Sequence, residues 1–184
     1  TGDYHTVTNL EICRGGHAVN LGGVGSIVTN NEMHDLTGSG VFLNNGSHSL
    51  ISGNLVTNTS YTQIYIVNGG SNWVHHNELH KTSLTILSNV TLTGVSDRSN
   101  IGLLGGTNNL VEHNNLSHAY HAFFDYFYET ASEVRFNYGF SANHAASPDG
   151  TGLRLHHNIF NLDGVGSGIS GQHNYDTNYS TGPD

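Results

Sequence analysis

One short pattern recurs along the chain: an aliphatic residue, two further residues and then an asparagine. It occurs in IVTNNEM (27–33), LISGNLV (50–56), WVHHNEL (73–79), LVEHNNL (110–116), EVRFNYG (133–139) and RLHHNIF (154–160). The asparagines are 23, 23, 37, 23 and 21 residues apart, and TVTNLEI (6–12) is a further copy with Leu10 in the asparagine position. A repeat of about 20–30 residues with one strand-like core predicts a solenoid, because one such unit buries its apolar side only by stacking on its neighbours.

The composition favours short strands and tight bends over helices. The chain has 24 Gly, 2 Pro and 23 Asn, and its apolar residues alternate by two, as in Val41 and Leu43 or Ile64 and Ile66. That period is typical of strands, and no segment has the spacing of an amphipathic helix. Asparagine tolerates the left-handed backbone of a sharp bend. We therefore expect the repeated asparagines to stack at bends and to share amide hydrogen bonds: Asn31, Asn54, Asn77, Asn114, Asn137 and Asn158.

The units SGVFLNNGSHSLISGNLV (39–56) and SNIGLLGGTNNLVEHNNL (99–116) resemble the repeat of the right-handed parallel β-helix. That fold is shared by pectate lyases, alginate lyases and epimerases, and several glycoside hydrolases. The resemblance implies an all-β single domain over residues 1–184, either complete or a piece of a longer chain. It also implies a secreted or cell-surface protein that acts on a polysaccharide or oligosaccharide. The chain length predicts about seven or eight rungs, each ~4.8 Å high.

Charge is sparse and acidic, with a formal net charge of −9 and 10% charged residues. Nucleic-acid and anionic-membrane binding need basic clusters, which five Lys and Arg residues do not supply. No apolar run approaches the ~20 residues of a membrane span. Cys13 has no cysteine partner in the chain, and we expect it to be a small buried apolar residue.

An outward column on the first strand of each rung is the predicted sugar-binding face. The segments 40–44, 64–68, 101–105 and 124–128 each place one residue between two inward aliphatic or aromatic ones. These intervening residues are Phe42, Tyr65, Gly102 and Asp125. Aromatic rings stack against the apolar faces of sugars, so Phe42 and Tyr65 are predicted to bind substrate. The alternative is that these rings have no binding role, because an outward Tyr on a strand is common.

Asp125 is also the first candidate for catalysis. Asp149, in SPDGTGLRL, falls near the corresponding segment of the next rung, and glycosidases pair carboxylates roughly 5–10 Å apart. His118 or His121 could serve as a general acid or base near Asp125, and His34 lies on the same loop side. Asp149 is equally explained as an ordinary turn residue in PDG.

The 37-residue interval predicts a loop insertion at 81–99, and long loops on rigid scaffolds concentrate function. If the protein is a lyase, Lys81 or Arg98 in this loop would be the base or would neutralise substrate charge. The apolar residues of the segment favour a surface flap instead. A pectate-lyase-like base would be an Arg in the first-strand column, and this column has no Arg. The acidic cluster that binds calcium in those lyases is not evident either, so we expect no cofactor, with Ca²⁺ as the alternative.

The histidines beside the asparagines form two expected columns. His75, Glu112, Arg135 and His156 share one, and His76, His113 and His157 share the other. Zinc sites need three or four convergent ligands, so hydrogen bonding is favoured over metal binding there. Two functions remain open: a hydrolase or lyase acting on glycans, and a non-catalytic module such as an adhesin or a filament or appendage subunit. The second includes end-to-end self-association.

Overall fold

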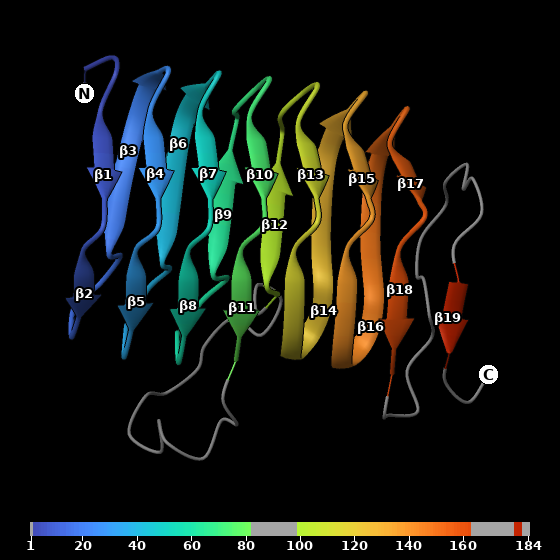
Figure 1. Ribbon diagram of the computed structural model, residues 1–184. Helices are drawn as coiled ribbons and strands as arrows, with labels where there is room; N and C mark the ends of the chain where they lie inside the picture. The colour runs from blue at the N-terminus through green and yellow to red at the C-terminus, as the bar shows by residue number, and fades with distance from the viewer. Residues whose placement is uncertain (1, 82–98, 163–178, 182–184) are drawn as a thin grey trace.

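The computed structural model describes residues 2–81, 99–162 and 179–181, and within these ranges every regular element is a strand. The strands form three parallel faces (Figure 1). Sheet A contains β1 (Thr6–Thr8), β4 (Ile27–Thr29), β7 (Leu50–Ser52), β10 (Trp73–His75), β13 (Leu110–Glu112), β15 (Glu133–Arg135) and β17 (Arg154–His156).

Sheets B and C complete each turn. Sheet B contains β2 (Glu11–Cys13), β5 (Glu32–His34), β8 (Leu55–Thr57), β11 (Glu78–His80), β18 (Ile159–Asn161) and β19 (Tyr179–Thr181). Sheet C contains β3 (Val19–Val24), β6 (Val41–Ser47), β9 (Ile64–Val67) and β12 (Ile101–Leu104). Two long strands, β14 (Asn115–Thr130) and β16 (Tyr138–Thr151), begin in sheet B and end in sheet C, so they join the two faces.

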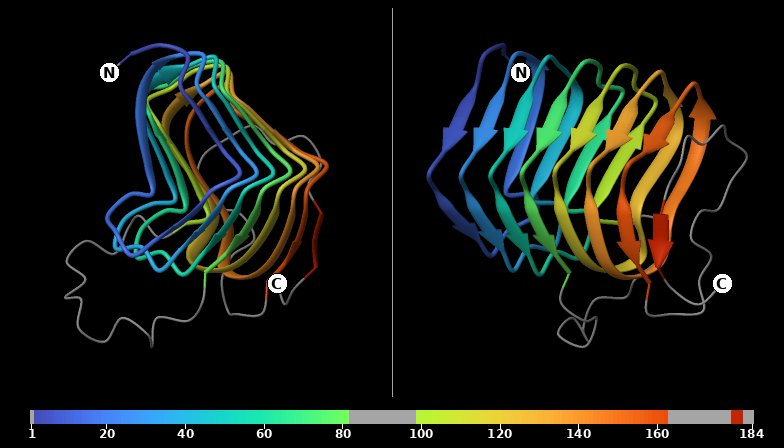
Figure 2. Two further views of the ribbon diagram at one scale, coloured as in Figure 1. Left: turned by 60° about the vertical axis from the view of Figure 1, so that its left-hand side comes forward. Right: turned by 45° about the vertical axis from the view of Figure 1, so that its right-hand side comes forward.

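The chain is a right-handed parallel β-helix, as the repeat predicts. Every strand pair is parallel, with a strand of one turn lying beside the equivalent strand of the next (Figure 2), and the register shifts only within β3–β6 and β14–β16 among the described pairs. Sheet A has seven strands, so six turns (7 − 1) separate β1 from β17. That is slightly fewer than the expected seven or eight rungs.

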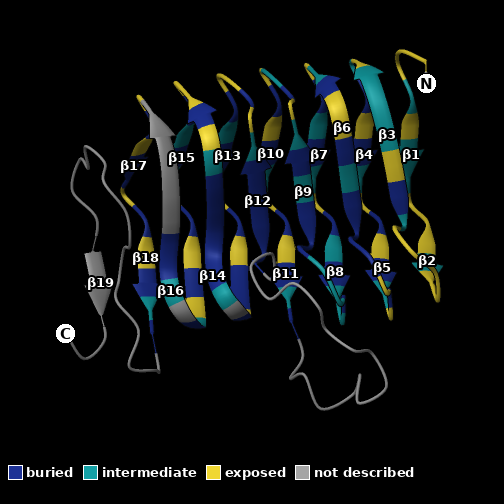
Figure 3. Ribbon diagram, turned by 180° about the vertical axis from the view of Figure 1, so that it is seen from behind, coloured by how far each residue is buried: buried dark blue, intermediate teal, exposed yellow. Residues whose placement is uncertain are grey.

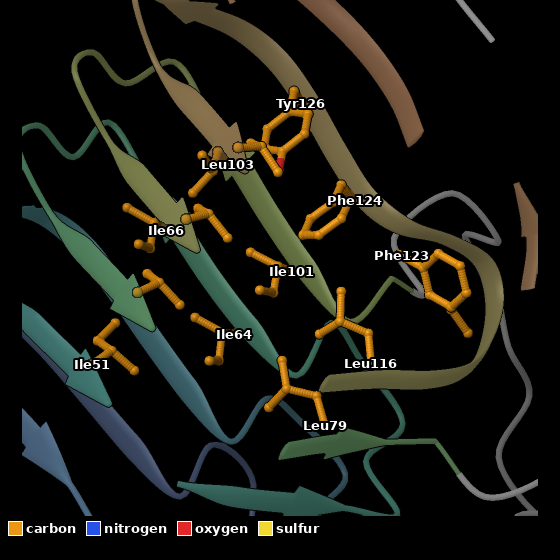
Figure 4. Close-up of a cluster of buried hydrophobic side chains, with 14 of the residues drawn as sticks. Ile51, Ile64, Ile66, Leu79, Ile101, Leu103, Leu116, Phe123, Phe124 and Tyr126 are labelled. Carbon is orange, nitrogen blue, oxygen red and sulfur yellow. The ribbon is translucent and has the colours of Figure 1, made fainter. Parts of the chain in front are cut away.

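The core is a narrow stack of side chains inside the coil. Most strands bury alternate residues, because side chains point to opposite faces of a pleated strand. In sheet C the pairs are Val41 with Leu43, Ile64 with Ile66, Ile101 with Leu103 and Phe124 with Tyr126, all 0–1% exposed. Figure 3 shows the buried residues along these strands, and Figure 4 shows the stack from the inside. Burying one such side chain contributes roughly 1.5–3 kcal/mol.

The asparagine ladder is confirmed at the bend between sheets A and B. Each amide nitrogen donates to the amide oxygen one turn on, at 2.9–3.0 Å, from Asn31 through to Asn158. All six side chains are at most 2% exposed. The backbone N–H of Leu10 donates to Asn31 Oδ1 at 3.1 Å, which confirms the seventh copy.

The left-handed residue at this bend is the one before each ladder asparagine, not the asparagine itself. Positive φ is found at Asn9, Asn30, Gly53, His76, His113, Phe136 and His157. The ladder asparagines are held by their amide bonds, while the preceding exposed residue makes the turn. Non-glycine residues there carry backbone strain that the ladder hydrogen bonds offset.

A second polar ladder lies at the bend between sheets C and A, and the sequence analysis missed it. Asn72 Nδ2 donates to Asn109 Oδ1 at 3.0 Å, and the backbone N–H of Ser49 donates to Asn72 Oδ1 at 2.9 Å. Glu129 is fully buried next to it and accepts from Asn109 Nδ2 and Ser132 Oγ, at 3.2 and 2.7 Å. Burial raises the pKa of Glu129 despite these bonds.

Candidate functional site

The predicted outward column of sheet C is confirmed by the strand register. Phe42 pairs with Tyr65, Tyr65 with Gly102, and Gly102 with Asp125. Phe42 and Tyr65 are partly exposed, and their ring centroids are 5.8 Å apart. The column therefore runs parallel to the axis of the coil, one residue for each turn.

Two further rings extend this column into an aromatic strip, defined here as His17, Phe42, Tyr65 and Tyr61. The ring of His17 stacks on Phe42 at 4.7 Å with an interplanar angle of 18°. Tyr61 meets the edge of Tyr65 at 5.7 Å. His17 and Tyr61 lie outside the regular strands, and alternation alone does not place them in the column.

Gly102 gives the strip its shape. A Cβ at this position would lie 2.9 Å from Tyr65 Cδ2 and 3.2 Å from Thr62 Cγ2. The Tyr65 ring therefore leans over the glycine, and any side chain at residue 102 would displace it. A glycine inside an otherwise apolar strand is a recognised sign of close approach by another group.

Asp125 continues the column but does not face solvent freely. It is 3% exposed and accepts a hydrogen bond from Ser99 Oγ. His121 Nδ1 lies 3.1 and 3.3 Å from its two carboxylate oxygens. The expectation that Asp125 faces the substrate is therefore corrected: its register is outward, but Ser99 and His121 cover it.

The His121–Asp125 pair has the geometry of an oriented general base. A carboxylate only accepts hydrogen bonds, so the proton of neutral His121 sits on Nδ1 and Nε2 carries the basic lone pair. The His121 side chain is 32% exposed. Its ring meets that of His144 edge-on at 5.4 Å. His121 is predicted from the sequence to lie near Asp125, and the structure brings the two side chains together.

The other two catalytic candidates lie elsewhere. The residue beside Asp125 on β16 is Ser147, and Asp149 lies beside Phe127, two positions further along. The side chain of Asp149 is not among those described, so the carboxylate pair remains a prediction. His118 is exposed where β14 leaves sheet B, with Nδ1 3.0 Å from Ser117 Oγ and its ring 6.0 Å from Phe140.

Of the two cationic candidates, only Lys81 lies within the described residues. It is 5% exposed and its backbone N–H donates to Ser117 O, and its contact with substrate remains a prediction. Arg98 lies outside the described residues. The predicted loop insertion at 81–99 also lies outside them, apart from its two end residues.

The strand register confirms the expected outward row of sheet A, His75, Glu112, Arg135 and His156. Arg135 bonds Glu112 and Glu133, each at 2.8 Å, and His156 Nε2 lies 2.9 Å from Glu133. Burial acts to raise the pKa of Glu112, but hydrogen bonds from Arg135 and Trp73 hold that pKa below its usual value. These contacts give the side chains of Glu112, Arg135 and His156 a structural role on sheet A.

A ridge of exposed rings follows the bend between sheets A and B. The rings of His76, His113, Phe136 and His157 stack one turn apart, at 5.2, 5.4 and 5.3 Å. This ridge carries the left-handed residues described above.

His34 and Asp35, also expected near the glycan site, lie on the sheet B side instead. His34 Nε2 is 3.2 Å from Glu11 Oε1, and His34 Nδ1 is 3.0 Å from Asp35 Oδ2. Cys13 is exposed beside them, which corrects its expected burial. The sequence carried a signal for this, since Glu11 and Cys13 flank the inward Ile12 in a period-two pattern.

Fold and site together define a right-handed parallel β-helix protein with an aromatic strip on one face. The family described as right-handed β-helix region matches residues 1–181, and the chain belongs to that family. An alginate lyase from Paenibacillus sp. str. FPU-7 is similar in structure with a TM-score of 0.46 and 12% identity, over 91% of this chain and 76% of that one. A likeness of that size carries no argument about activity.

No curated protein sequence matches the chain significantly. Among the residues that the structure describes, no helix is long and apolar enough to cross a membrane.

Proposed function

We propose that this protein binds a polysaccharide along the outward face of sheet C and cleaves it there. The observation that carries the proposal is the in-register column in which Phe42, Tyr65 and Gly102 lead to the His121–Asp125 pair. A binding surface and a proton-transfer group thus share one face. The expected place of action is outside the cell or at its surface, where such substrates occur.

Binding is attributed to the aromatic strip. The rings of His17, Phe42 and Tyr65 follow the coil axis at successive centroid distances of 4.7 and 5.8 Å, so an extended sugar chain lying along the axis would contact several rings at once. Tyrosine and phenylalanine supply apolar area with little loss of side-chain freedom. The expected ligand is therefore an oligosaccharide of several units rather than a single sugar.

Cleavage is attributed to His121, positioned by Asp125. In an elimination, His121 Nε2 would remove the proton from the carbon next to the sugar carboxylate. The electron pair of that C–H bond would form a C=C bond as the glycosidic C–O bond breaks, and the leaving oxygen would take a proton from water. In a hydrolysis, His121 would activate water, with Asp149 as the partner acid. Asp125 is shielded by Ser99 and His121, which favours a role in orienting the histidine over direct attack.

A screen of charged and neutral polysaccharides tests this proposal. Reducing ends report either reaction, and absorbance of an unsaturated product reports elimination alone. We expect His121→Gln to abolish cleavage while retaining oligosaccharide binding. The matched control is His48→Asn. His48 is exposed and has a left-handed backbone that asparagine also adopts, and the variant should keep full activity. Cleavage by His121→Gln at the parent rate would refute the assigned role.

A further inference from the structure

A second group of reactive side chains lies on sheet B, away from the aromatic strip. Glu11 and Cys13 point outward from β2, and His34 points outward from β5 with its backbone in register with Cys13. One potential ligand atom of each residue lies within 4.8 Å of the other two. Carboxylate, thiolate and imidazole thus converge from two neighbouring turns.

The histidine is oriented by a partner on its other nitrogen. Asp35 Oδ2 lies 3.0 Å from His34 Nδ1, while His34 Nε2 faces Glu11. Asp35 is itself held by Asn58 Nδ2 from the next turn. Histidines that bind metals usually donate their second N–H to a carboxylate, which fixes the ring and makes the ligating nitrogen more basic.

From this geometry we infer a site for a divalent transition metal of the zinc class, bound by Glu11, Cys13 and His34. Zinc takes thiolate, imidazole and carboxylate ligands at about 2.0–2.3 Å in tetrahedral geometry. Ligand atoms in such a site lie closer together than 4.8 Å, and the exposed side chains of Glu11 and Cys13 can rotate inward to close the difference. Three protein ligands leave the fourth position for water or another ligand.

The Cys13 thiol distinguishes a metal site from a simple ion pair. Glu11, His34 and Asp35 alone would form an exposed charge network, as His80 does with Glu78 on β11 at 2.7 Å. Soft thiolate ligands select zinc-class metals over calcium or magnesium. Cys13 therefore indicates the class of metal.

Cobalt titration tests the site, because Co²⁺ reports its ligands optically. Cys13 is the one cysteine of the chain, so a thiolate-to-cobalt charge-transfer band can come from no other residue. We expect that band together with visible bands of tetrahedral intensity, and displacement of both by Zn²⁺. The titration uses the full chain in a non-thiol reductant.

Substitutions separate this site from unspecific binding by the 14 histidines. Cys13→Ser should remove the charge-transfer band, and His34→Gln should lower Co²⁺ affinity by more than tenfold. Asp35→Asn should lower it by about 10–100-fold, because the carboxylate that accepts from His34 Nδ1 is lost. The control His80→Gln removes a histidine bonded to glutamate without a nearby thiol, and it should leave affinity unchanged. Absence of the band in the parent, or equal losses in His34→Gln and His80→Gln, would overturn the inference.

Discussion

Asn77 Nδ2 donates to Asn114 Oδ1 at 3.0 Å across an interval of 37 residues. The equivalent bond from Asn54 to Asn77 spans 23 residues and is 2.9 Å long. The additional residues between β11 and β12 therefore leave the ladder undisturbed. Insertions are tolerated in such a coil as long as the next strand returns to its register, since each turn contacts only its neighbours.

Asn77→Leu should lower the free energy of unfolding by about 1–3 kcal/mol, because it leaves Asn54 N–H and Ile51 O without their partner. Urea unfolding followed by circular dichroism measures this. Asn115→Leu is the matched control, since Asn115 is exposed at the start of β14, and its effect should stay within about 0.5 kcal/mol. Equal stability of Asn77→Leu and the parent would contradict the role of the ladder.

Glu129 should make the protein less stable as the pH rises above the usual range for glutamate. Its pKa is raised in the folded state by burial, so folding disfavours its charged form. The penalty is absent below the unfolded pKa and grows as pH rises through the folded pKa, by roughly 1.4 kcal/mol for each unit of difference.

Glu129→Gln should remove that decline and be more stable than the parent at neutral pH, because an amide oxygen can still accept from Asn109 and Gly106. Urea unfolding at acidic and neutral pH gives the comparison. Glu129→Leu serves as the control and should destabilise at both pH values, since it removes every hydrogen bond. A parent-like decline in Glu129→Gln would assign the pH dependence to other groups.

Tyr65→Ala should weaken oligosaccharide binding by about 1–2 kcal/mol and leave the melting temperature nearly unchanged, because the ring lies on the outward face of the strand. Calorimetric titration measures the affinity. Tyr138→Ala removes a tyrosine ring from sheet B that is more exposed, at 47%, and it should bind as the parent does. Equal losses in the two variants would place the sugar elsewhere.

Gly102→Ala tests the aromatic strip through the residue on which the Tyr65 ring rests. The new methyl group would meet the Tyr65 ring at 2.9 Å, so the ring must move. We expect weaker binding than in the parent, with Tyr65 still present. In the double variant Gly102→Ala/Tyr65→Ala the glycine substitution should add little further loss. Additive losses would indicate that residue 102 affects binding without acting through Tyr65.

The coil and the column could be predicted from the sequence because both follow from local periodicities. The 21–23-residue spacing fixes which asparagines meet, and alternation in β6 and β9 fixes which residues point outward. The second ladder escaped notice because its positions hold Ser26, Ser49 and Ser132 as well as Asn72 and Asn109. Each residue type suits the bend, but no single letter recurs.

The place of Asp149 could not be read from spacing. An irregularity between Ala119 and Ala122 shifts the register of β14 against β16 before Asp125 is reached. Asp125 consequently pairs with Ser147, and Asp149 pairs with Phe127. The burial of Asp125 could not be predicted either. Ser99, which donates to it, is the last residue of the long insertion and lies 26 positions earlier in the chain.

A crystal structure of the His121→Gln variant with a bound oligosaccharide is the most direct test of the proposed function. It should show sugar rings stacked over Phe42 and Tyr65, with a glycosidic bond beside residue 121. Sugar bound instead along the ridge of His76, His113, Phe136 and His157, or on sheet B, would contradict the proposed site.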